Sequence, residues 1–536
     1  MQRTMMNYPL TLTHILERAG KVFPEREVVS RLPDRSLLRY TYGDFYRRAR
    51  SLAAALQKAG LRRGDRVATL MWNHYAHLEA YFGIPAAGGV LQTLNLRLAP
   101  HEIAYIANHA GDRFLIVDDI LLPTFEKIKD QVQFARIFVV PLTGKPISAQ
   151  YEDYEDFLKS APADFRYPEL DENEGASLCY TSGTTGMPKG VLYTHRSVVL
   201  HTWLSTMIDN FAICHGDVVL PVVSMFHVNG WGLPFASPFV GAKLVLPGPY
   251  LDSESLLELF EKERVTVAAG VPTIWLSLIE CLDKHPELRQ HLPGRVLVGG
   301  AAPPVALIRK LDALGIKLTQ GWGLTESSPQ ATTNQLKQHM LNWPADDRYE
   351  LTSMAGIPVP FVERRVVSDQ GEVPWDGQTI GEIQLRGPWV AASYFNLPEE
   401  TSKWSDDGWF RTGDVGSVDQ NGYLKIVDRT KDLIKSGGEW ISSVDLENAL
   451  VAHPGVREAA VIAVPHPKWQ ERPLAVIVAK DDAKPSADEL RSFLQDRFAK
   501  WQLPDAFVFV DELPHTSTGK LLKLELRRRY RDWRWS

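Results

Sequence analysis

Cysteine is scarce in this chain of 536 residues, and basic charge is not in excess. The three cysteines, Cys179, Cys214 and Cys281, lie far apart with no CxxC spacing. This spacing predicts reduced, buried thiols, and it argues against disulfides or a zinc site. The net charge of −6 argues against a nucleic-acid-binding surface, which needs a basic bias. The sequence therefore predicts a cytoplasmic protein that binds no nucleic acid.

Long apolar runs are also absent from the sequence. No uninterrupted run of about 18 apolar residues occurs, so we expect no membrane-spanning helix. The first residues, MQRTMMNYPL, have no apolar core of the kind found in signal peptides. A hydrophobic content of 44% and a charged content of 23% are ordinary globular values. A chain of this length predicts two or three domains.

Helical and strand-like patterns alternate along most of the chain. Residues 45–60 predict an amphipathic helix that ends at a glycine, and residues 66–72 predict a short apolar strand. Residues 255–272 and 306–323 repeat the order of helix and then strand. Repeated units of this kind predict an α/β fold with parallel sheets and helices on both faces.

The composition changes late in the chain. Residues 381–390 and 422–430 predict strands, with a Gly- and Asp-rich loop over 405–422. A smaller α+β unit follows, with helices predicted at 442–456 and 486–499, each with a serine cap, and a strand at 458–467. We therefore expect a large N-terminal domain over 1–428 that includes a smaller β subdomain, a hinge over 429–433, and a small mobile domain over 434–536.

The stretch YTSGTTGMPKGV, residues 180–191, combines glycines with hydroxyl side chains and a lysine. Glycines let backbone N–H groups approach an anion closely, and hydroxyls add donors, so this stretch predicts a phosphate-binding loop. A Walker A loop is excluded because Gly183 and Gly186 are only three apart and Gly190 follows Lys189. Taken alone, the stretch is also compatible with a plain polar turn.

Four further motifs follow in order, and together they carry a family resemblance. They are QGWGLTESSP (320–329), WFRTGD (409–414), DRTKDLIKSGGEW (428–440) and HTSTGKLLK (515–523). With the phosphate loop they resemble the adenylate-forming superfamily, which holds acyl-CoA synthetases, luciferases and the adenylation domains of peptide synthetases. SMFHVNGWGLP (224–234) and residues 434–450 are most similar to medium- and long-chain fatty acyl-CoA synthetases of bacterial type.

This resemblance implies a reaction in two halves that uses ATP, Mg²⁺ and coenzyme A. A carboxylate first attacks the α-phosphate of ATP and gives acyl-AMP, and the thiol of coenzyme A then displaces AMP. Two unit charges 4 Å apart repel by about 4 kcal/mol at an effective dielectric of 20, so the site must supply positive charge. The resemblance assigns that charge to Lys520, although an isolated lysine is more often a solvated surface residue.

The resemblance also implies which residues bind the nucleotide. Glu326 would hold Mg²⁺ with Thr181 nearby, and Thr325 would donate to the α-phosphate. Asp414 would accept the ribose hydroxyls with help from Arg429. Trp322 departs from the usual tyrosine of the family but still offers a flat face to adenine. The full implied set is Thr181, Ser182, Gly183, Thr184, Thr185, Gly186, Lys189, Gly300, Ala301, Gln320, Gly321, Trp322, Thr325, Asp414 and Arg429.

The small domain is implied to rotate about the hinge between the two half-reactions. Lys431 is the matching hinge position, and Gly437 and Gly438 would line the pantetheine channel. Lys435, also a candidate catalytic residue, and Trp440 belong to the same loop. A surface hairpin with a glycine turn is the alternative.

The acyl site is implied to lie near 227–231. His227 and Trp231 are the candidate acid-binding residues, and Val228 lies between them in the stretch that joins the nucleotide and acyl sites. Trp231 would gate an apolar tunnel, or would simply be a core tryptophan. In such a tunnel each buried methylene adds about 0.8 kcal/mol to binding.

Other interpretations stay open at this point. The acid could be short and sulfur-containing or branched, the adenylate could feed a luciferase-like oxygenase, or the protein could bind ligands without turnover. The tail LRRRYRDWRWS could lie on an anionic membrane, but the sequence favours a final helix docked on the domain. Relatives often pair, which leaves a homodimer open.

Overall fold

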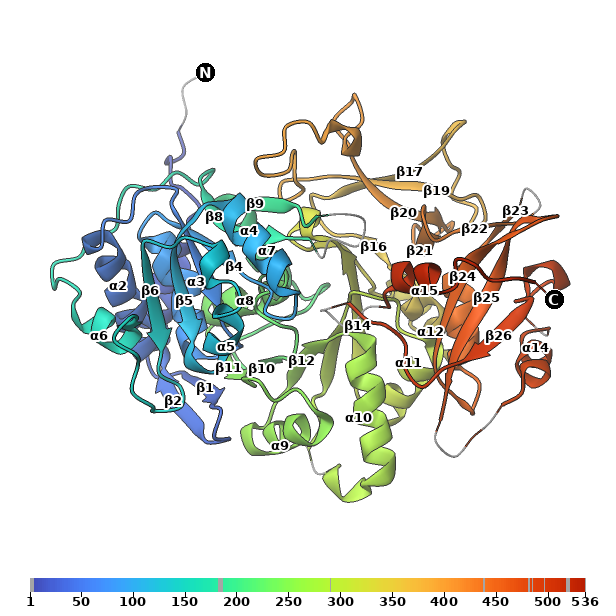
Figure 1. Ribbon diagram of the computed structural model, residues 1–536, viewed down its shortest axis with the longest axis horizontal. Helices are drawn as coiled ribbons and strands as arrows, with labels where there is room; N and C mark the ends of the chain where they lie inside the picture. Colours follow the sequence, from blue (N-terminus) through green and yellow to red (C-terminus); the bar gives the residue numbers. More distant parts are fainter. Residues whose placement is uncertain are drawn as a thin grey trace.

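The computed structural model describes residues 4–181, 187–289, 291–436, 439–480, 483, 485–495, 497–516 and 521–535. Figure 1 shows two sheets with helices around them on the blue to yellow side, a third sheet above them, and a separate red C-terminal unit. Among the described residues, no helix is long and apolar enough to cross a bilayer.

The larger of the two N-terminal sheets has nine strands. Its central strands are parallel, and antiparallel strands close both ends, β2 at one and β15 and β16 at the other. In spatial order the strands are β16 (Ile357–Pro358), β15 (Gln330–Thr333), β14 (Lys317–Gly323), β13 (Arg295–Val298), β12 (Val267–Gly270), β10 (Val218–Pro221), β11 (Lys243–Leu246), β1 (Glu27–Arg31) and β2 (Leu37–Thr41).

The second N-terminal sheet has seven strands, all parallel except the last pair. Its order is β7 (Glu152–Asp153), β6 (Arg136–Val140), β5 (Asp112–Asp118), β3 (Arg66–Leu70), β4 (Val90–Thr93), β8 (Gly175–Tyr180) and β9 (Gly190–Thr194). The predicted α/β domain with sheets rich in parallel strands is therefore confirmed.

The helices of this domain include the three that the sequence predicts at the start of residues 45–60, 255–272 and 306–323. Their bounds are α1 (Leu12–Val22), α2 (Tyr42–Lys58), α3 (Tyr75–Ala86), α4 (Pro100–Ala110), α5 (Leu122–Phe125), α6 (Tyr154–Lys159), α7 (His195–Thr206), α8 (Leu233–Val240), α9 (Ser253–Glu263), α10 (Pro272–Lys284), α11 (Val305–Ala313) and α12 (Ala345–Ser353). Thr41 caps α2 in a capping box with Asp44, and the left-handed Gly60 follows its end.

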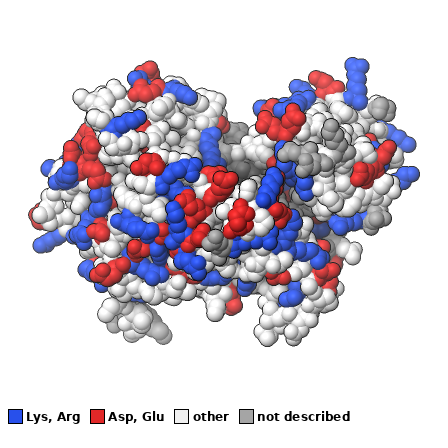
Figure 2. Space-filling view, turned by 90° about the horizontal axis from the view of Figure 1, so that it is seen from below, with Lys and Arg blue, Asp and Glu red and all other residues white. Residues whose placement is uncertain are grey.

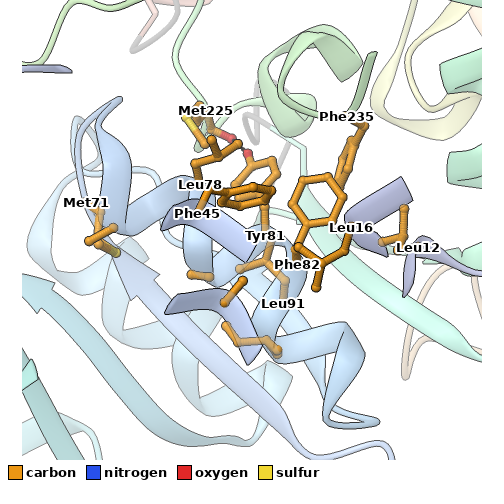
Figure 3. Close-up of a cluster of buried hydrophobic side chains, with 14 of the residues drawn as sticks. Leu12, Leu16, Phe45, Met71, Leu78, Tyr81, Phe82, Leu91, Met225 and Phe235 are labelled. Atoms are coloured by element: carbon orange, nitrogen blue, oxygen red, sulfur yellow. Dashed lines mark hydrogen bonds between the residues drawn. The ribbon is translucent and has the colours of Figure 1, made fainter. Parts of the chain in front are cut away.

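The main core lies where α1, α2, α3 and α8 meet the strands. Phe45 and Phe82 pack edge to face with ring centroids 5.3 Å apart, and both are fully buried. Figure 3 shows these rings beside Phe235, with the Tyr81 hydroxyl donating to the carbonyl of Met225. This contact fastens the loop after β10, which carries the candidate acyl site, to the rigid helix α3.

An antiparallel five-stranded sheet forms the predicted β subdomain. Its order is β18 (Gly371–Glu372), β17 (Glu363–Ser368), β19 (Gly381–Arg386), β20 (Phe410–Val418) and β21 (Leu424–Arg429). The expectation of a loop throughout 405–422 is wrong, because the strand β20 occupies half of this stretch. Its glycines and Asp414 suggested a turn, but nearly every residue of β20 is buried between β19 and β21.

The C-terminal unit is the predicted α+β domain. Its strands are β22 (Ile434–Ser436), β23 (Glu439–Ile441), β24 (Val456–His466), β25 (Gln470–Ala479) and β26 (Ala506–Phe509), with helices α13 (Ser443–Val451), α14 (Ala487–Gln495) and α15 (Lys523–Arg529). Ser442 caps α13, and the hydroxyl of Ser486 accepts from the first turn of α14. Both predicted serine caps are confirmed.

The aromatic tail is docked on this domain. Tyr530, Trp533 and Trp535 pack on the face of β24 and β25 beside Leu526, and the Trp535 indole donates to the carbonyl of Pro465 at 2.7 Å. The preferred interpretation of the tail, a final helix with docked aromatics, is confirmed.

All three cysteines are free, as predicted, but they are not all buried. Cys179 is buried, Cys281 is partly buried and Cys214 is exposed, because it lies in the turn before β10. Figure 2 shows Lys and Arg interspersed with Asp and Glu over the face that it presents, which fits the small net charge.

Candidate active site

The base of the phosphate loop is closed by a pair of hydrogen bonds. The backbone N–H of Thr181 donates to the carbonyl of Lys189 at 2.9 Å, and the N–H of Lys189 donates to the Thr181 hydroxyl at 3.0 Å. The antiparallel strands β8 and β9 run into this base. The predicted loop residues Ser182, Gly183, Thr184, Thr185 and Gly186 lie outside the described residues.

Lys189 is joined to the predicted magnesium ligand through a tyrosine. Its ammonium forms an ion pair with Glu400 at 2.6 Å and lies 5.1 Å from the ring centroid of Tyr394. The Tyr394 hydroxyl donates to Glu326 Oε1 at 2.5 Å. Burial and the charge of Glu326 raise the pKa of Tyr394, so the phenol stays protonated and keeps donating.

Thr325 and Glu326 lie in a short 3₁₀ turn after β14. Each is 7% exposed, and the Tyr193 hydroxyl of β9 donates to the Thr325 carbonyl at 2.5 Å. This bond ties the Thr-Glu turn to the strand that leaves the phosphate loop. One buried carboxylate with an accessible oxygen suits Mg²⁺ that takes its other ligands from nucleotide phosphates and water. No group of three or more potential metal ligands occurs among the described residues.

The predicted ribose site is assembled from β14, β20 and β21. The Trp322 indole donates to Asp414 Oδ2 at 3.1 Å, and Arg429 Nε lies 3.4 Å from Asp414 Oδ1. Asp414 and Arg429 are also directly paired across the two strands. Asp414 is 6% exposed, so its carboxylate is held in place by both neighbours. Although Trp322 replaces the usual tyrosine, its indole N–H still supplies a hydrogen-bond donor at this position.

The candidate adenine loop follows β13. Gly300 has a left-handed φ of 82°, and both Gly300 and Ala301 are exposed, so their backbone is open to a ligand. Gly321 packs on Phe211. When its amide is oriented to donate, Gln320 reaches the carbonyls of Thr352, Ser353 and Met354 at 2.7–3.1 Å. The side chain of Gln320 is thereby engaged with the end of α12, so its backbone is the part left for a ligand.

A left-handed turn carries the candidate acyl residues. Five consecutive residues, Val228 to Gly232, have φ between 45° and 78°, and all five are buried. Left-handed backbone costs about 1–2 kcal/mol for each residue with a side chain, so this turn needs anchors. Asn229 provides them, because its Oδ1 accepts from the Ser177 hydroxyl at 3.0 Å and from the Cys179 thiol at 3.3 Å on β8.

The turn places its two ends on different parts of the site. Trp231 is 8% exposed, and its ring would lie 3.2 Å from a Cβ built on Gly299, so a side chain at position 299 would crowd the indole. His227 and Thr181 line one cavity of about 10 Å³, room for a single water molecule. Trp231 thus packs beside the candidate adenine loop, and His227 beside the phosphate loop.

The predicted hinge residue Lys431 lies close to the predicted ribose site. Burial and the neighbouring charges of Arg429 and Arg527 lower the pKa of Lys431, and Asp414 acts in the opposite direction. Lys435 and Trp440 lie instead on the hairpin β22–β23, 5.4 Å from Lys435 Nζ to the Trp440 ring centroid. The Lys435 N–H donates to Glu471 of β25. The structure thus brings Lys431, but not Lys435 or Trp440, towards the nucleotide residues.

Three predicted residues, Lys520, Gly437 and Gly438, lie outside the described residues. Two site residues were missed, Tyr394 and Asn229. Tyr394 lies in a segment with no recognisable motif. Asn229 lies within FHVNGWGLP, and an Asn-Gly pair does signal left-handed backbone, so that signal was available in the sequence.

A large α/β domain followed by a small α+β domain is the architecture of the adenylate-forming enzymes. Family models agree with it. The AMP-binding enzyme model matches residues 16–395, and the AMP-binding enzyme C-terminal domain model matches residues 445–520. The chain belongs to the AMP-binding enzyme family.

Curated relatives resemble the chain over almost its whole length. The long-chain-fatty-acid–CoA ligase of Thermus thermophilus is 50% identical over 99% of this chain and 97% of the relative. The 3-methylmercaptopropionyl-CoA ligase of Ruegeria lacuscaerulensis is 44% identical over 98% of both chains. The medium-chain-fatty-acid–CoA ligase of Ectopseudomonas oleovorans is 43% identical over 98% of this chain and 97% of the relative.

Solved structures resemble the fold equally broadly. The anthranilate CoA ligase AuaEII in complex with anthranoyl-AMP has a TM-score of 0.86 at 26% identity, over 98% of both chains. ATP-bound MatB from Rhodopseudomonas palustris has a TM-score of 0.83 at 26% identity, over 98% of this chain and 99% of that one.

Proposed function

We propose that this protein is an AMP-forming acid–thiol ligase that converts a medium- or long-chain fatty acid to its coenzyme A thioester. The observation that carries the proposal is the connected set of Glu326, Tyr394 and Lys189 on one side and Trp322, Asp414 and Arg429 on the other. The 50% identity to a long-chain-fatty-acid–CoA ligase supports the substrate class.

In the first half-reaction a carboxylate oxygen of the acid attacks the α-phosphorus of ATP. The new bond joins oxygen to phosphorus, and the bond to pyrophosphate breaks. Asp414 fixes the ribose, the Trp322 face lies against adenine, and the phosphate-loop donors with Lys189 hold the phosphates, so the reactants are kept in line. Lys520 offsets the repulsion between carboxylate and phosphate. Glu326 would hold Mg²⁺, which supplies further positive charge to the phosphates when it is bound.

In the second half-reaction the coenzyme A sulfur attacks the acyl carbon, and AMP leaves. The small domain turns about Lys431, which withdraws Lys520 and brings the segment with Lys435, Gly437, Gly438 and Trp440 to the channel. This division requires domain boundaries near residues 428 and 434. The β21 strand, which ends at Arg429, and the β22 strand, which begins at Ile434, support such a division.

The test is AMP release that depends on ATP, Mg²⁺ and coenzyme A, across a ladder of acids from propionate to palmitate with 3-methylmercaptopropionate included. We expect activity to rise with chain length by about fourfold per methylene and then to stop where the tunnel ends. No AMP with any acid would refute the ligase proposal. A maximum at the sulfur-containing acid would favour the second candidate, which the 44% identity to a 3-methylmercaptopropionyl-CoA ligase supports. Size-exclusion chromatography would test a homodimer.

A further inference from the structure

Four side chains meet where the N-terminal and C-terminal domains join. Asp428 Oδ2 accepts from the Ser443 N–H at 3.0 Å and also from the Ser443 hydroxyl. Lys523 Nζ lies 2.5 Å from the same hydroxyl and 2.8 Å from Glu447 Oε1. All four residues are at most 8% exposed. We call Asp428, Ser443, Glu447 and Lys523 the junction cluster.

The junction cluster crosses the hinge. Asp428 is on β21, three positions before Lys431, whereas Ser443 begins α13 and Lys523 begins α15. A rotation about Lys431 leaves Asp428 with the N-terminal domain and carries the other three side chains away. Asp428 would then lose two donors that a buried carboxylate needs. The cluster therefore favours the orientation of the C-terminal domain seen in this structure.

That orientation places α15 next to the hinge. Arg527 of α15 pairs with Asp432, and the charges of both Arg527 and Asp414 act on Lys431. On the two sides of residues 517–520, His515 forms an isolated β-bridge with Leu521, and the Leu522 N–H donates to the Pro514 carbonyl at 2.8 Å. In the sequence, Lys520 precedes the first residue of α15 by three positions. The hairpin β22–β23 lies at the outer side of the domain in Figure 1.

We infer that Asp428 is a positioning residue that holds the C-terminal domain, through Ser443 and Lys523, in the orientation for acyl-AMP formation. This inference rests on the proposed two-step function and adds to it a residue that touches neither substrate nor nucleotide. It predicts that loss of Asp428 affects the two half-reactions unequally.

A second contact across the same junction provides a matched control. Lys425 of β21 forms an ion pair with Asp445 of α13 at 3.1 Å, with side chains 45% and 31% exposed. An exposed pair is screened by solvent and contributes little. Lys425→Ala therefore removes a contact between the same two elements without removing a buried one.

The experiment measures the half-reactions separately in the full-length protein. Adenylation is followed by ATP–pyrophosphate exchange with the best acid, and thioester formation by coenzyme A consumption from supplied acyl-AMP. Asp428→Ala should lower exchange by about tenfold and leave thioester formation unchanged or faster. Asp428→Asn should lose less, since its amide oxygen still accepts from Ser443. Lys425→Ala should stay within about twofold in both assays.

Three results would overturn the inference: an equal loss in both half-reactions, a larger loss in thioester formation, or no loss of exchange in a folded Asp428→Ala protein. If Asp428→Ala does not fold, Asp428→Asn and Ser443→Ala carry the same test. The wild-type protein separates this inference from the proposed function. A wild type inactive with every acid refutes the function, whereas an active wild type with an unaffected Asp428→Ala variant refutes only the positioning role.

Discussion

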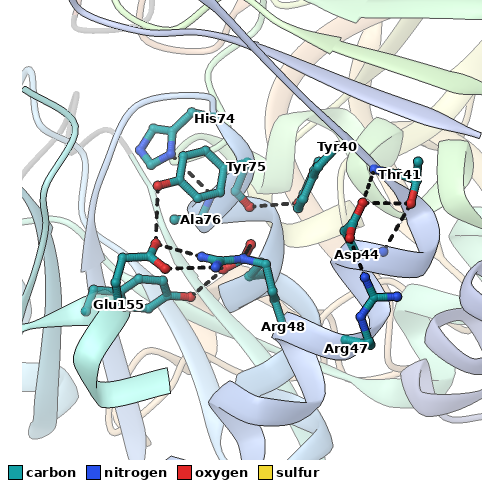
Figure 4. Close-up of polar contacts among 11 residues, drawn as sticks. Tyr40, Thr41, Asp44, Arg47, Arg48, His74, Tyr75, Ala76 and Glu155 are labelled. Atoms are coloured by element: carbon teal, nitrogen blue, oxygen red, sulfur yellow. Dashed lines mark hydrogen bonds and ion pairs between the residues drawn. The ribbon is translucent and has the colours of Figure 1, made fainter. Parts of the chain in front are cut away.

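Two ion clusters in this protein, one partly buried and one buried, use similar chemistry in different places. In the N-terminal domain, Arg48 pairs with Glu79 at 2.6 Å and with Glu155 at 2.7 Å, and Tyr154 also donates to Glu79. Figure 4 shows Arg48 of α2 reaching Glu155 beside Tyr75. In the junction cluster, Lys523 is the central cation, and it contacts both Glu447 and Ser443.

The difference between the clusters lies in what they connect. Arg48, Glu79 and Glu155 come from α2, α3 and α6 of one domain, so their contacts persist in every domain orientation. The junction cluster spans the proposed hinge, so a rotation there would break its contacts. A contact made in one of two states shifts the equilibrium between them, whereas a contact made in both does not. We therefore expect the first cluster to govern stability and the second to govern the balance of half-reactions.

The largest effect is expected from substitution of Lys520. This variant also tests whether the two assays report on the two half-reactions independently. Lys520→Ala should lower ATP–pyrophosphate exchange by about a thousandfold, because it removes the charge that offsets the repulsion of carboxylate and phosphate. Thioester formation from supplied acyl-AMP should remain largely intact. An equal loss in the two assays would show that they cannot report on the junction cluster separately.

Substitution of Arg48, the cation in the ion cluster of the N-terminal domain, should affect only the stability of the protein. Arg48→Met should lower the free energy of unfolding by about 3 kcal/mol, because the fully buried Glu79 loses its positive partner. Denaturant titration measures this loss of stability. In the folded fraction, the rates of the two half-reactions should keep the ratio that they have in the wild type, as measured by the two assays. Arg47→Ala is the matched control on the same helix. Its side chain is 69% exposed in its pair with Asp44, so we expect less than about 0.5 kcal/mol.

Mild acid should change the folding stability of the two domains in opposite directions. Burial lowers the pKa of His77 to about 3 and those of His195 and His201 to about 4, so they stay neutral when folded. Below about pH 6.5 the unfolded chain binds protons that the folded domain cannot, so stability falls by up to about 1.4 kcal/mol per pH unit for each histidine.

Burial instead raises the pKa of Glu447 in the C-terminal domain to about 7. Its favourable contribution is present below pH 4.5 and is lost as the pH rises towards 7. Hydrogen exchange at pH 5 and pH 7.5 should therefore show that acid loosens the N-terminal domain more than the C-terminal one. Equal loosening of both domains would contradict this contrast.

Substitutions of Asn229 test whether side-chain hydrogen bonds stabilise the left-handed backbone of residues 228–232. Asn229→Gly keeps the left-handed conformation but leaves the Ser177 hydroxyl and Cys179 thiol without their acceptor, which should cost about 1–2 kcal/mol. Asn229→Ala should cost about 1 kcal/mol more, because alanine resists a positive φ. Thermal unfolding checks both values. Equal stability of the two variants would show that the turn is not strained at this position.

The smallest effect is expected at Trp322. Trp322→Phe keeps a flat face for adenine but removes the donor to Asp414, so the KM for ATP should rise about fivefold. Trp322→Tyr restores a phenolic donor and serves as the control, with a smaller rise. Steady-state kinetics with varied ATP distinguish these outcomes, and equal KM values for all three proteins would exclude a role for the indole N–H.

Local patterns predicted much of this architecture. The helix at α2, the strand β3 and the serine caps of α13 and α14 follow from apolar periodicity and capping chemistry, which act within a few residues. The strand β20 was missed because its glycines and Asp414 resemble a turn, and only pairing with β19 and β21 makes it a strand. The exposure of Cys214 could not be predicted, because spacing carries no information about burial.

The sequence by itself determined the order of motifs and the residue types that can bind phosphate, ribose and metal, because these depend on chemical groups at fixed spacing. Tertiary structure decided which of these groups meet. It joined Trp322 to Asp414 across 92 positions and Tyr394 to Glu326 across 68, and it brought Asp428 and Lys523 together at Ser443. Such contacts arise from the packing of strands distant in the chain, and no local propensity encodes them.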